Sequence, residues 1–309
     1  MERNAELESS LELLEDKPVF VAPGALYVVA TPIGRLVDIS VRAIRVLSQV
    51  DLIAAEDTRR TYILLNQLGI KKEVVSNQKF NEHRKTEFFL NALRDGKSVA
   101  VVSDAGTPCI SDPGNELIKA ALAEGFAAVP VPGACAAVSA LSVSGFDLTS
   151  FAFRGFFPKE NARRREEIRQ LRRGDVKSVC YYESPKRIVK TISFLAEALP
   201  DARLCLCNDL TKTHERFYRG APGEVLAELE AHPNADKGEY TLILSPENAG
   251  GEPEVLALSP AAALAEELAR NGGTARDAIE RILARPDNQL KKNDLKDAAL
   301  RLREIFGEV

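Results

Sequence analysis

The sequence has few of the residues that bind metal ions, and it lacks the glycine-rich motifs that bind nucleotides. It contains 3 histidines and 5 cysteines but no HExxH and no CxxC sequence, so neither a structural nor a catalytic zinc site is expected. No GxG and no GxxxxGK[ST] sequence occurs either. The absence of these motifs argues against a nicotinamide-binding Rossmann domain and against a P-loop enzyme.

Segments that would direct a chain into or across a membrane are also missing. No apolar run approaches the length of a membrane span, which takes about 20 residues. The opening segment, MERNAELESSLELLED, is acidic and lacks the basic start and apolar centre of a secretory signal. We expect residues 1–23 to form a mobile or loosely docked extension. Cys205 and Cys207 have the spacing of one strand face among apolar neighbours, which predicts buried thiols and suits the cytoplasm.

The formal net charge of -4 gives no generally basic surface for nucleic acid. Residues 163–177, RRREEIRQLRRGDVK, are a local exception. If this segment is helical, Arg165, Arg169, Arg172 and Arg173 share one face. Most basic runs of this kind form an ordinary solvent-exposed helix face. The alternative interpretation is that this face binds RNA.

Short apolar runs alternate with segments of helical periodicity, which predicts two α/β domains. The first should hold a mostly parallel sheet, whereas two strand-like segments close together around Thr211 favour a mixed sheet in the second. The expected strands are 26–30, 52–55, 74–75, 98–103 and 127–131, followed by 151–156, 178–182, 203–208, 214–218 and 240–244. Helices are expected near 160–173, 186–198 and 223–231 in the second domain.

The expected domain boundaries follow from this alternation. The first α/β domain should span 24–131 and the second 132–247. Residues 248–309 should combine a Pro/Gly-rich linker, which begins within PENAGGEPEV, with a small helical region of two or three amphipathic helices.

Unusual loops follow several predicted strands, which is where open α/β sheets bind ligands. Residues 103–114, SDAGTPCISDPG, are the most informative, because their prolines, glycines and hydroxyls fix a loop whose Asp104 could accept from an ammonium group. The TPIG sequence at 31–34 is a turn in its simplest interpretation. In EDTRR, at 56–60, Asp57 or Thr58 would cap the next helix. The small residues at 133–137 suit either tight packing or a flat ligand.

Taken together, these segments resemble one family. LYVVATPIG, DLIAAEDTRRT, VSDAGTPCISDPG, VPVPGACA, YYESPKR and DLTKTHE are similar, in order and spacing across residues 24–248, to the signature segments of the bacterial 16S ribosomal RNA cytidine 2′-O-methyltransferases. The resemblance implies a tetrapyrrole-methylase-like fold of two α/β domains with S-adenosylmethionine in the cleft between them. It also implies a cytoplasmic homodimer that acts on 16S rRNA in the small ribosomal subunit, with no metal and no membrane.

The resemblance assigns a cofactor site to loops of both domains. Residues from the first sheet's loops would line the methionine and adenosine parts, and residues of the second domain would cover them. The implied cofactor residues are Thr31, Pro32, Gly34, Asp104, Ala105, Gly106, Thr107, Ser111, Asp112, Gly133, Ala134, Ala137, Phe156, Leu210, Thr211, Glu239 and Tyr240. The sequence departs from the family at Arg35, Lys186 and Asn208-Asp209, which concerns substrate contacts more than the cofactor.

Methyl transfer to a ribose hydroxyl needs orientation and a base. Glu56 and Asp57 are the candidate bases because they follow a strand that ends at the cleft, and Arg59 stands beside them. The candidate contacts to substrate RNA are Arg60, Arg165, Arg169, Arg172, Arg187 and Lys212. Two alternatives stay open at this point: a tetrapyrrole-type methylase of small molecules, and a non-catalytic RNA- or ribosome-binding protein of the same fold.

Overall fold

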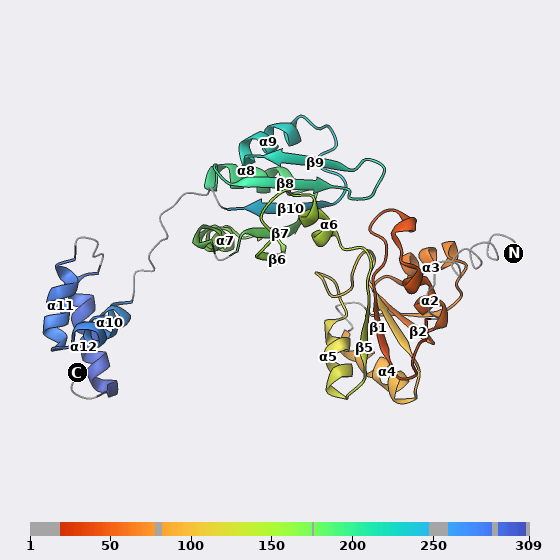
Figure 1. The fold of residues 1–309 in the computed structure, drawn as a ribbon, viewed down its shortest axis with the longest axis horizontal. Helices are drawn as coiled ribbons and strands as arrows, with labels where there is room; N and C mark the ends of the chain where they lie inside the picture. The colour runs from red at the N-terminus through yellow and green to blue at the C-terminus, as the bar shows by residue number, and fades with distance from the viewer. Residues whose placement is uncertain (1–18, 78–81, 175, 247–258, 286–289, 307–309) are drawn as a thin grey trace. The chain divides into compact units, whose positions relative to one another are not determined.

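The computed structural model describes residues 19–77, 82–174, 176–246, 259–285 and 290–306. The described residues up to 246 form one compact unit, and those from 259 onward form a second (Figure 1). None of the described helices is both long enough and apolar enough to cross a lipid bilayer.

A five-stranded parallel sheet begins the first unit, in the order β3-β2-β4-β1-β5. The strands LIAA (β2) and VAVV (β4) are buried along their whole length, as expected of interior strands covered on both faces. The elements are β1 (Leu26–Val29), η1 (Leu36–Asp38), α2 (Val41–Gln49), β2 (Leu52–Ala55), α3 (Thr58–Gln67), β3 (Glu73–Ser76), α4 (Glu82–Arg94), β4 (Val99–Val102), α5 (Asn115–Ala123) and β5 (Ala128–Val131).

Two apolar cores cover this sheet, one on each face. Leu47 of α2 and Leu65 of α3 pack on one face, and Phe89 of α4 and Leu117 of α5 pack on the other. The helix after β1 therefore crosses one face, while the helix after β4 crosses the opposite face. Because β1 and β4 are neighbours, the connections switch faces between them, and open α/β sheets bind ligands at the carboxyl ends of strands at such a point, here called the crevice.

A second five-stranded sheet follows, in the order β6-β7-β10-β8-β9, and it is mixed. Only β6 and β7 run parallel; the other neighbours are antiparallel. The elements are α6 (Ala136–Ser142), β6 (Phe151–Phe156), α7 (Asn161–Arg173), β7 (Ser178–Glu183), α8 (Ile188–Ala198), β8 (Arg203–Asn208), β9 (Arg216–Gly220), α9 (Pro222–Glu230) and β10 (Tyr240–Ser245).

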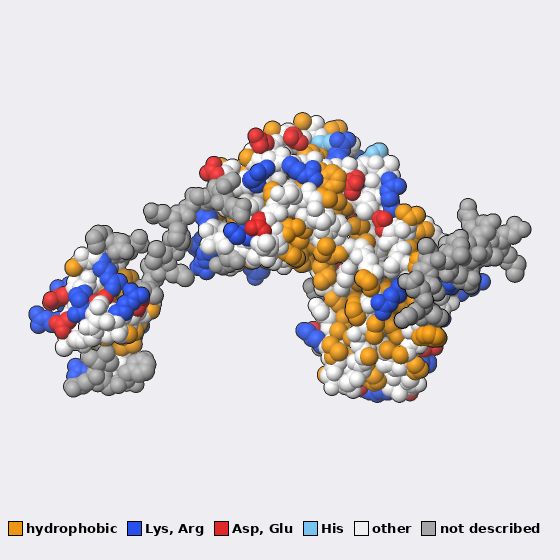
Figure 2. Space-filling model, in the orientation of Figure 1, with side chains coloured by type: hydrophobic (Ala, Val, Ile, Leu, Met, Phe, Trp, Pro, Cys, Tyr) orange, Lys and Arg blue, Asp and Glu red, His pale blue; other side chains and the backbone are white. Residues whose placement is uncertain are grey.

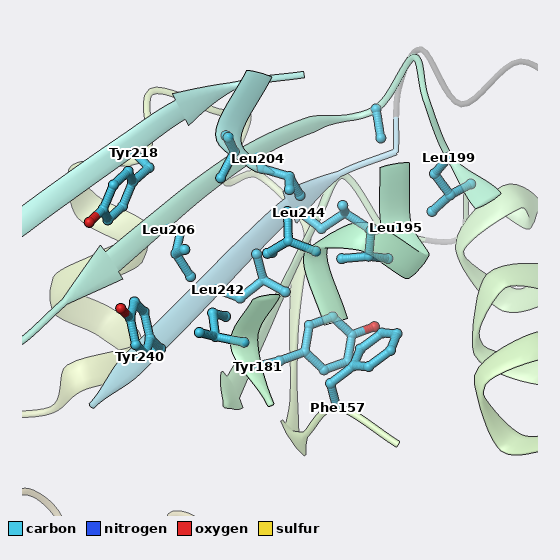
Figure 3. Close-up of a cluster of buried hydrophobic side chains, with 14 of the residues drawn as sticks. Phe157, Tyr181, Leu195, Leu199, Leu204, Leu206, Tyr218, Tyr240, Leu242 and Leu244 are labelled. Atoms are coloured by element: carbon cyan, nitrogen blue, oxygen red, sulfur yellow. The ribbon is translucent and has the colours of Figure 1, made fainter. Parts of the chain in front are cut away.

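The larger core of the second sheet lies under α7, α8 and α9. Figure 3 shows Phe157 against Tyr181, and leucines of the central strands beside Leu195 of α8. The opposite face packs on α6 and contains the thiols of Cys180, Cys205 and Cys207. All three thiols are buried, which confirms the prediction for Cys205 and Cys207.

The second unit is a group of three helices around its own small core. The helices are α10 (Pro260–Asn271), α11 (Ala275–Leu283) and α12 (Lys292–Phe306). Leu264, Ile282 and Leu295 bury their side chains between them. Hydroxyl caps begin the first two helices, from Ser259 and Thr274.

The predicted fold class is confirmed: two α/β sheets are followed by a helical C-terminal region. The expected strand 214–218 instead begins at Arg216, because residues 209–215 form a turn. Most of the expected linker and residues 1–18 lie outside the described residues. Val19 and Val21, within the expected extension, pack against the first core. The domain boundaries themselves stay a prediction.

Candidate active site

Two loops meet at the crevice between β1 and β4. Thr31 and Gly106 form a backbone bridge, in which the Thr31 N–H donates to Gly106 O at 2.9 Å and the Gly106 N–H donates to Thr31 O at 3.0 Å. Gly106 has a φ of 79°, and a Cβ atom there would lie 3.2 Å from Cγ2 of Ile33. Only glycine suits both the backbone conformation and this close approach. The TPIG and SDAGTP segments, which the family resemblance assigns to one cofactor site, are thereby joined.

The loop after β5 closes against the same place. The Thr107 hydroxyl donates to Ala134 O at 3.0 Å, and a Cβ atom on Gly133 would lie 3.0 Å from Cβ of Ala30. The loops that follow β1, β4 and β5 therefore form one continuous edge. Most predicted cofactor residues of the first sheet lie along this edge.

Carboxyl groups gather at the ends of β2 and β4. Glu56 Oε2 accepts from the backbone N–H of Asp104 at 3.3 Å, and Asp104 Oδ1 accepts from the backbone N–H of Asp57 at 3.0 Å. These reciprocal bonds fix the EDTRR segment against the start of the 103–114 loop. Arg60 Nη1 lies 3.5 Å from Asp104 Oδ2 and partly balances the negative charge.

The pKa values of the two candidate bases are shifted in opposite directions. Burial raises the pKa of Glu56 above its usual value, against the effect of the Asp104 N–H. The side chain and backbone of Arg59 lower the pKa of Asp57 to about 2. Asp57 also caps α3 through the Arg59 N–H at 2.9 Å, and its other oxygen lies 2.7 Å from Arg59 Nη2. Asp57 is thus held as an ionised cap, which leaves Glu56 as the stronger base.

Asp112 is a third carboxyl group with unusual titration. Burial raises its pKa to about 6, followed by the negative charge of Glu56, although Ser103 donates a hydrogen bond that opposes the rise. The loop reaches Asp112 through left-handed backbone at Cys109 and Ser111, whose φ angles are 71° and 74°. Residues other than glycine rarely adopt this left-handed conformation.

The second sheet contributes one residue with an altered pKa that the sequence did not single out. Burial raises the pKa of Tyr182, with smaller rises from Cys135, Cys180 and Asp112, while a hydrogen bond from the Ala137 backbone opposes the rise. The Tyr182 ring packs edge-on against Phe153 at 4.9 Å and Phe156 at 6.0 Å. The only available signal was its position near the end of a predicted strand, in YYESP.

The other cofactor residues predicted in the second domain differ in burial, since some have accessible side chains and others lie in the core. Phe156 is half exposed, and the Thr211 hydroxyl accepts from the Arg35 N–H at 3.3 Å. Tyr240 points into the core, where its hydroxyl donates to Ala235 O at 2.9 Å (Figure 3). Leu210 packs in the core beside α6. Among these, Phe156 and Thr211 have the side chains most accessible to the first sheet's loops.

The predicted RNA contacts form no single cluster. Arg187 is mostly buried, ion-paired with Glu183, and donates to Phe157 O at 3.3 Å. Lys212 is ion-paired with Asp209 and Glu239. Three exposed side chains, Arg165, Arg169 and Arg172, lie on α7, over which Figure 2 shows Lys and Arg side chains gathered.

The comparisons with known proteins identify the family. Residues 25–226 match the pattern of the Tetrapyrrole (Corrin/Porphyrin) Methylases. A protein of Halalkalibacterium halodurans named Ribosomal RNA small subunit methyltransferase I is 39% identical over 88% of this chain and 93% of its own length. Proteins with the same name from Neisseria meningitidis serogroup B and Thermotoga maritima are 44% and 41% identical over 73% and 72% of this chain, and over 77% and 98% of their own lengths.

Solved structures show the same fold at low sequence identity. A uroporphyrin-III C-methyltransferase of Thermus thermophilus, complexed with S-adenosylhomocysteine, matches 72% of this chain and 97% of its own with a TM-score of 0.50 at 18% identity. A cobalt precorrin-4 methyltransferase matches 74% of this chain and 97% of its own with a TM-score of 0.54 at 18% identity. With the crevice, its loops and these matches together, the chain is a methyltransferase that belongs to the tetrapyrrole (corrin/porphyrin) methylase family.

Proposed function

We propose that this enzyme transfers a methyl group from S-adenosylmethionine to the ribose 2′-hydroxyl of a cytidine in 16S rRNA. The observation that carries this proposal is the likeness, across 88% of the chain, to a relative whose name gives ribosomal RNA of the small subunit as its substrate. The solved porphyrin and corrin methylases, by contrast, share only 18% sequence identity with this chain, so their likeness shows the fold and not the substrate.

The residues at the crevice fit this cofactor. S-adenosylmethionine supplies its methyl group from a sulfonium centre, and it also carries an ammonium and a carboxylate group. Asp104, Glu56 and Asp112 give the crevice a negative field that suits those cationic groups. The absence of a Cβ atom at Gly106 and Gly133 lets backbone approach backbone there, and the loop offers N–H groups for a carboxylate.

We assign the general base to Glu56. Its burial favours proton uptake, and its Oε2 already lies at the edge of the crevice, against the Asp104 N–H. The Glu56 carboxylate would take up the proton of the ribose hydroxyl as that oxygen accepts the methyl group; the cofactor's S–CH3 bond would break and its sulfur would leave as a neutral thioether. Asp57, ionised and paired with Arg59, would instead hold the start of α3 in place.

We further propose that α7 binds the RNA backbone. Its C-terminal turn carries Arg172 and Arg173, and Arg165 has an exposed side chain two turns earlier on the same face. Arg169 contacts Glu166, so a phosphate would have to compete with that exposed pair, which contributes little. The family resemblance adds two further proposals, a cytoplasmic location and a homodimer; sedimentation of the purified chain would test the latter.

The test is to incubate the purified protein with radiolabelled S-adenosylmethionine and small ribosomal subunits that lack native methylation. We expect label in a single 2′-O-methylcytidine of 16S rRNA. Subunits already methylated at that residue serve as the matched control and should accept no label. Label on a base, or no label despite measurable cofactor binding, would contradict the proposed substrate.

A further inference from the structure

A loop that follows a strand of the first sheet contacts a loop of the second sheet through a hydrogen bond. The backbone N–H of Arg35 donates to the Thr211 hydroxyl at 3.3 Å. A Cβ atom on Gly34 would lie 2.5 Å from that same hydroxyl oxygen and 2.9 Å from Cγ of Lys212. The approach is therefore so close that only glycine fits at position 34.

The loop on the second sheet is held in an unfavourable backbone conformation. Asp209 and Thr211 have φ angles of 52° and 65°. For the β-branched Thr211 this left-handed conformation is a real outlier, and it persists only where surrounding contacts hold it. Sites of this kind concentrate at ligand clamps and at segments that switch.

An ion-pair network supplies those holding contacts. Lys212 Nζ lies 2.7 Å from Asp209 Oδ1 and 2.8 Å from Glu239 Oε2. The Thr211 N–H donates to Glu215 Oε1 at 2.7 Å, and the Asp209 N–H donates to Glu239 O at 2.9 Å. Lys212 thus ties both ends of a strained turn to the segment before β10.

The other partner in the contact leads directly to the crevice. Thr31, three residues before Gly34, is bridged to Gly106, and the Ile33 side chain lies against Gly106. The 31–35 segment is therefore fastened to the first sheet's cofactor loop at Thr31 and to Thr211 at Arg35, and Ile33 between them packs against the apolar cluster beside α6. Removing the Thr211 contact would loosen the Arg35 end of the segment while Ile33 stays packed.

We propose that Thr211 and Lys212 form a clasp that holds residues 31–35 over the cofactor and sets the rate at which the cofactor leaves. Thr211 provides the contact, and Lys212 is a positioning residue that keeps the turn in place. This inference rests on the cofactor of the proposed function but not on its RNA substrate. It gives Lys212 a role inside the protein in place of a contact with RNA.

The test uses the full chain and S-adenosylhomocysteine, with no RNA. Thr211→Val removes the hydroxyl at nearly constant shape, Thr211→Ser keeps it, and Lys212→Met removes the ammonium group. Lys237→Met is the matched control, since the Lys237 ammonium group donates to Asn234 Oδ1 at 3.0 Å and lies outside the clasp. The readouts are the dissociation rate of labelled S-adenosylhomocysteine and hydrogen exchange at the Arg35 amide.

We expect T211V and K212M to speed dissociation about three- to tenfold, the effect of one hydrogen bond, and to speed exchange at Arg35. T211S and K237M should match the unaltered protein in both readouts. Faster exchange at Arg35 with unchanged dissociation would overturn the proposal, because the contact would then not retain the cofactor. Unchanged exchange in T211V would overturn it as well, because the contact would then be absent in solution.

The two proposals fail separately. If unmodified ribosomal subunits accept no methyl group but T211V still releases S-adenosylhomocysteine faster, the assigned substrate is wrong and the clasp stands. If 16S rRNA is methylated and dissociation is the same in all four variants, the substrate stands and the clasp is wrong.

Discussion

Thr31 and Gly106 exchange two backbone hydrogen bonds, of 2.9 and 3.0 Å, across the crevice where the loops after β1 and β4 part. The bridge is antiparallel, although the strands that lead into it, β1 and β4, run parallel. The Thr31 hydroxyl adds side-chain contacts to Ser103 O and Gly106 O, and together these bonds fix the start of the cofactor loop.

Gly106→Ala should therefore weaken cofactor binding by more than its effect on folding explains. Its φ of 79° costs alanine about 1–2 kcal/mol, and the added Cβ would also lie 3.2 Å from Ile33. Gly125→Ala is the matched control, because its φ is 82° but no atom lies within 4 Å of the added carbon. Both variants should lose unfolding free energy in denaturant titrations because of the shared φ, Gly106→Ala somewhat more because of the Ile33 contact, and only Gly106→Ala should lose affinity for S-adenosylhomocysteine in calorimetry.

Glu56→Gln should lower turnover much more than Asp57→Asn does. A general base contributes roughly 10²–10⁴-fold, and the raised pKa of Glu56 fits that role better than the pKa of about 2 at Asp57. Single-turnover methylation of unmodified small subunits measures the difference, with S-adenosylhomocysteine affinity as the control for an intact site. Equal turnover in Glu56→Gln and the unaltered enzyme would remove Glu56 from the role of base.

Affinity for S-adenosylmethionine should fall as the pH falls through about 6. The pKa of Asp112 is raised to about 6 by burial and then by Glu56 and Asp104. A bound sulfonium cation favours the ionised carboxylate, so binding is strongest above that pKa and weakens when Asp112 takes up a proton. The loss should approach tenfold roughly one unit below the pKa.

The neutral thioether of S-adenosylhomocysteine should show a smaller dependence, which makes it the internal control. Asp112→Asn should flatten the profile for S-adenosylmethionine between pH 5 and pH 7.5, a range set by the pKa of about 6. Calorimetry at several pH values gives both curves. Equal slopes for the two ligands would mean that Asp112 does not sense the sulfonium charge.

Neutralising α7 should weaken RNA binding and reduce its salt dependence. With Arg165, Arg169 and Arg172 changed to glutamine, the slope of log K against log salt should become shallower by about 2, since each lost phosphate contact contributes about 0.7–0.9. In the control variant, three exposed cationic residues of the first α/β domain are changed to glutamine instead: Arg42, Lys97 and Lys119. Filter binding of 16S rRNA at several salt concentrations should separate the two variants.

Much of the fold was predictable because the interior strands leave a plain signal. LIAA and VAVV are short, continuous apolar runs, and the physical requirement that both faces of a parallel sheet be covered makes them readable as strands. The 103–114 loop was identifiable for a similar reason, since its prolines and glycines restrict the backbone. Its attachment to TPIG followed only from the family resemblance.

The sequence does not indicate which partner each charged residue takes. Glu56 and Asp57 are adjacent acids, and their pKa values differ because burial raises that of Glu56 while Arg59 folds back onto Asp57 and lowers that of Asp57. Lys212 meets Glu239, 27 positions later, and no local pattern predicts that contact. The burial of Glu56 against the Asp104 loop and the pairing of Lys212 with Glu239 both depend on the tertiary fold, which brings segments distant in the sequence together.

The position of β10 in the second sheet has a consequence for how the enzyme is made. β10 is the last strand of that sheet in the chain, yet it lies between β7 and β8, which do not pair with each other. During translation, these strands therefore have no common partner until Ser245 has left the ribosome. Glu239, which holds Lys212, immediately precedes this strand. A nascent chain thus completes its first sheet early but gains the means to retain its cofactor only in the last quarter of its synthesis.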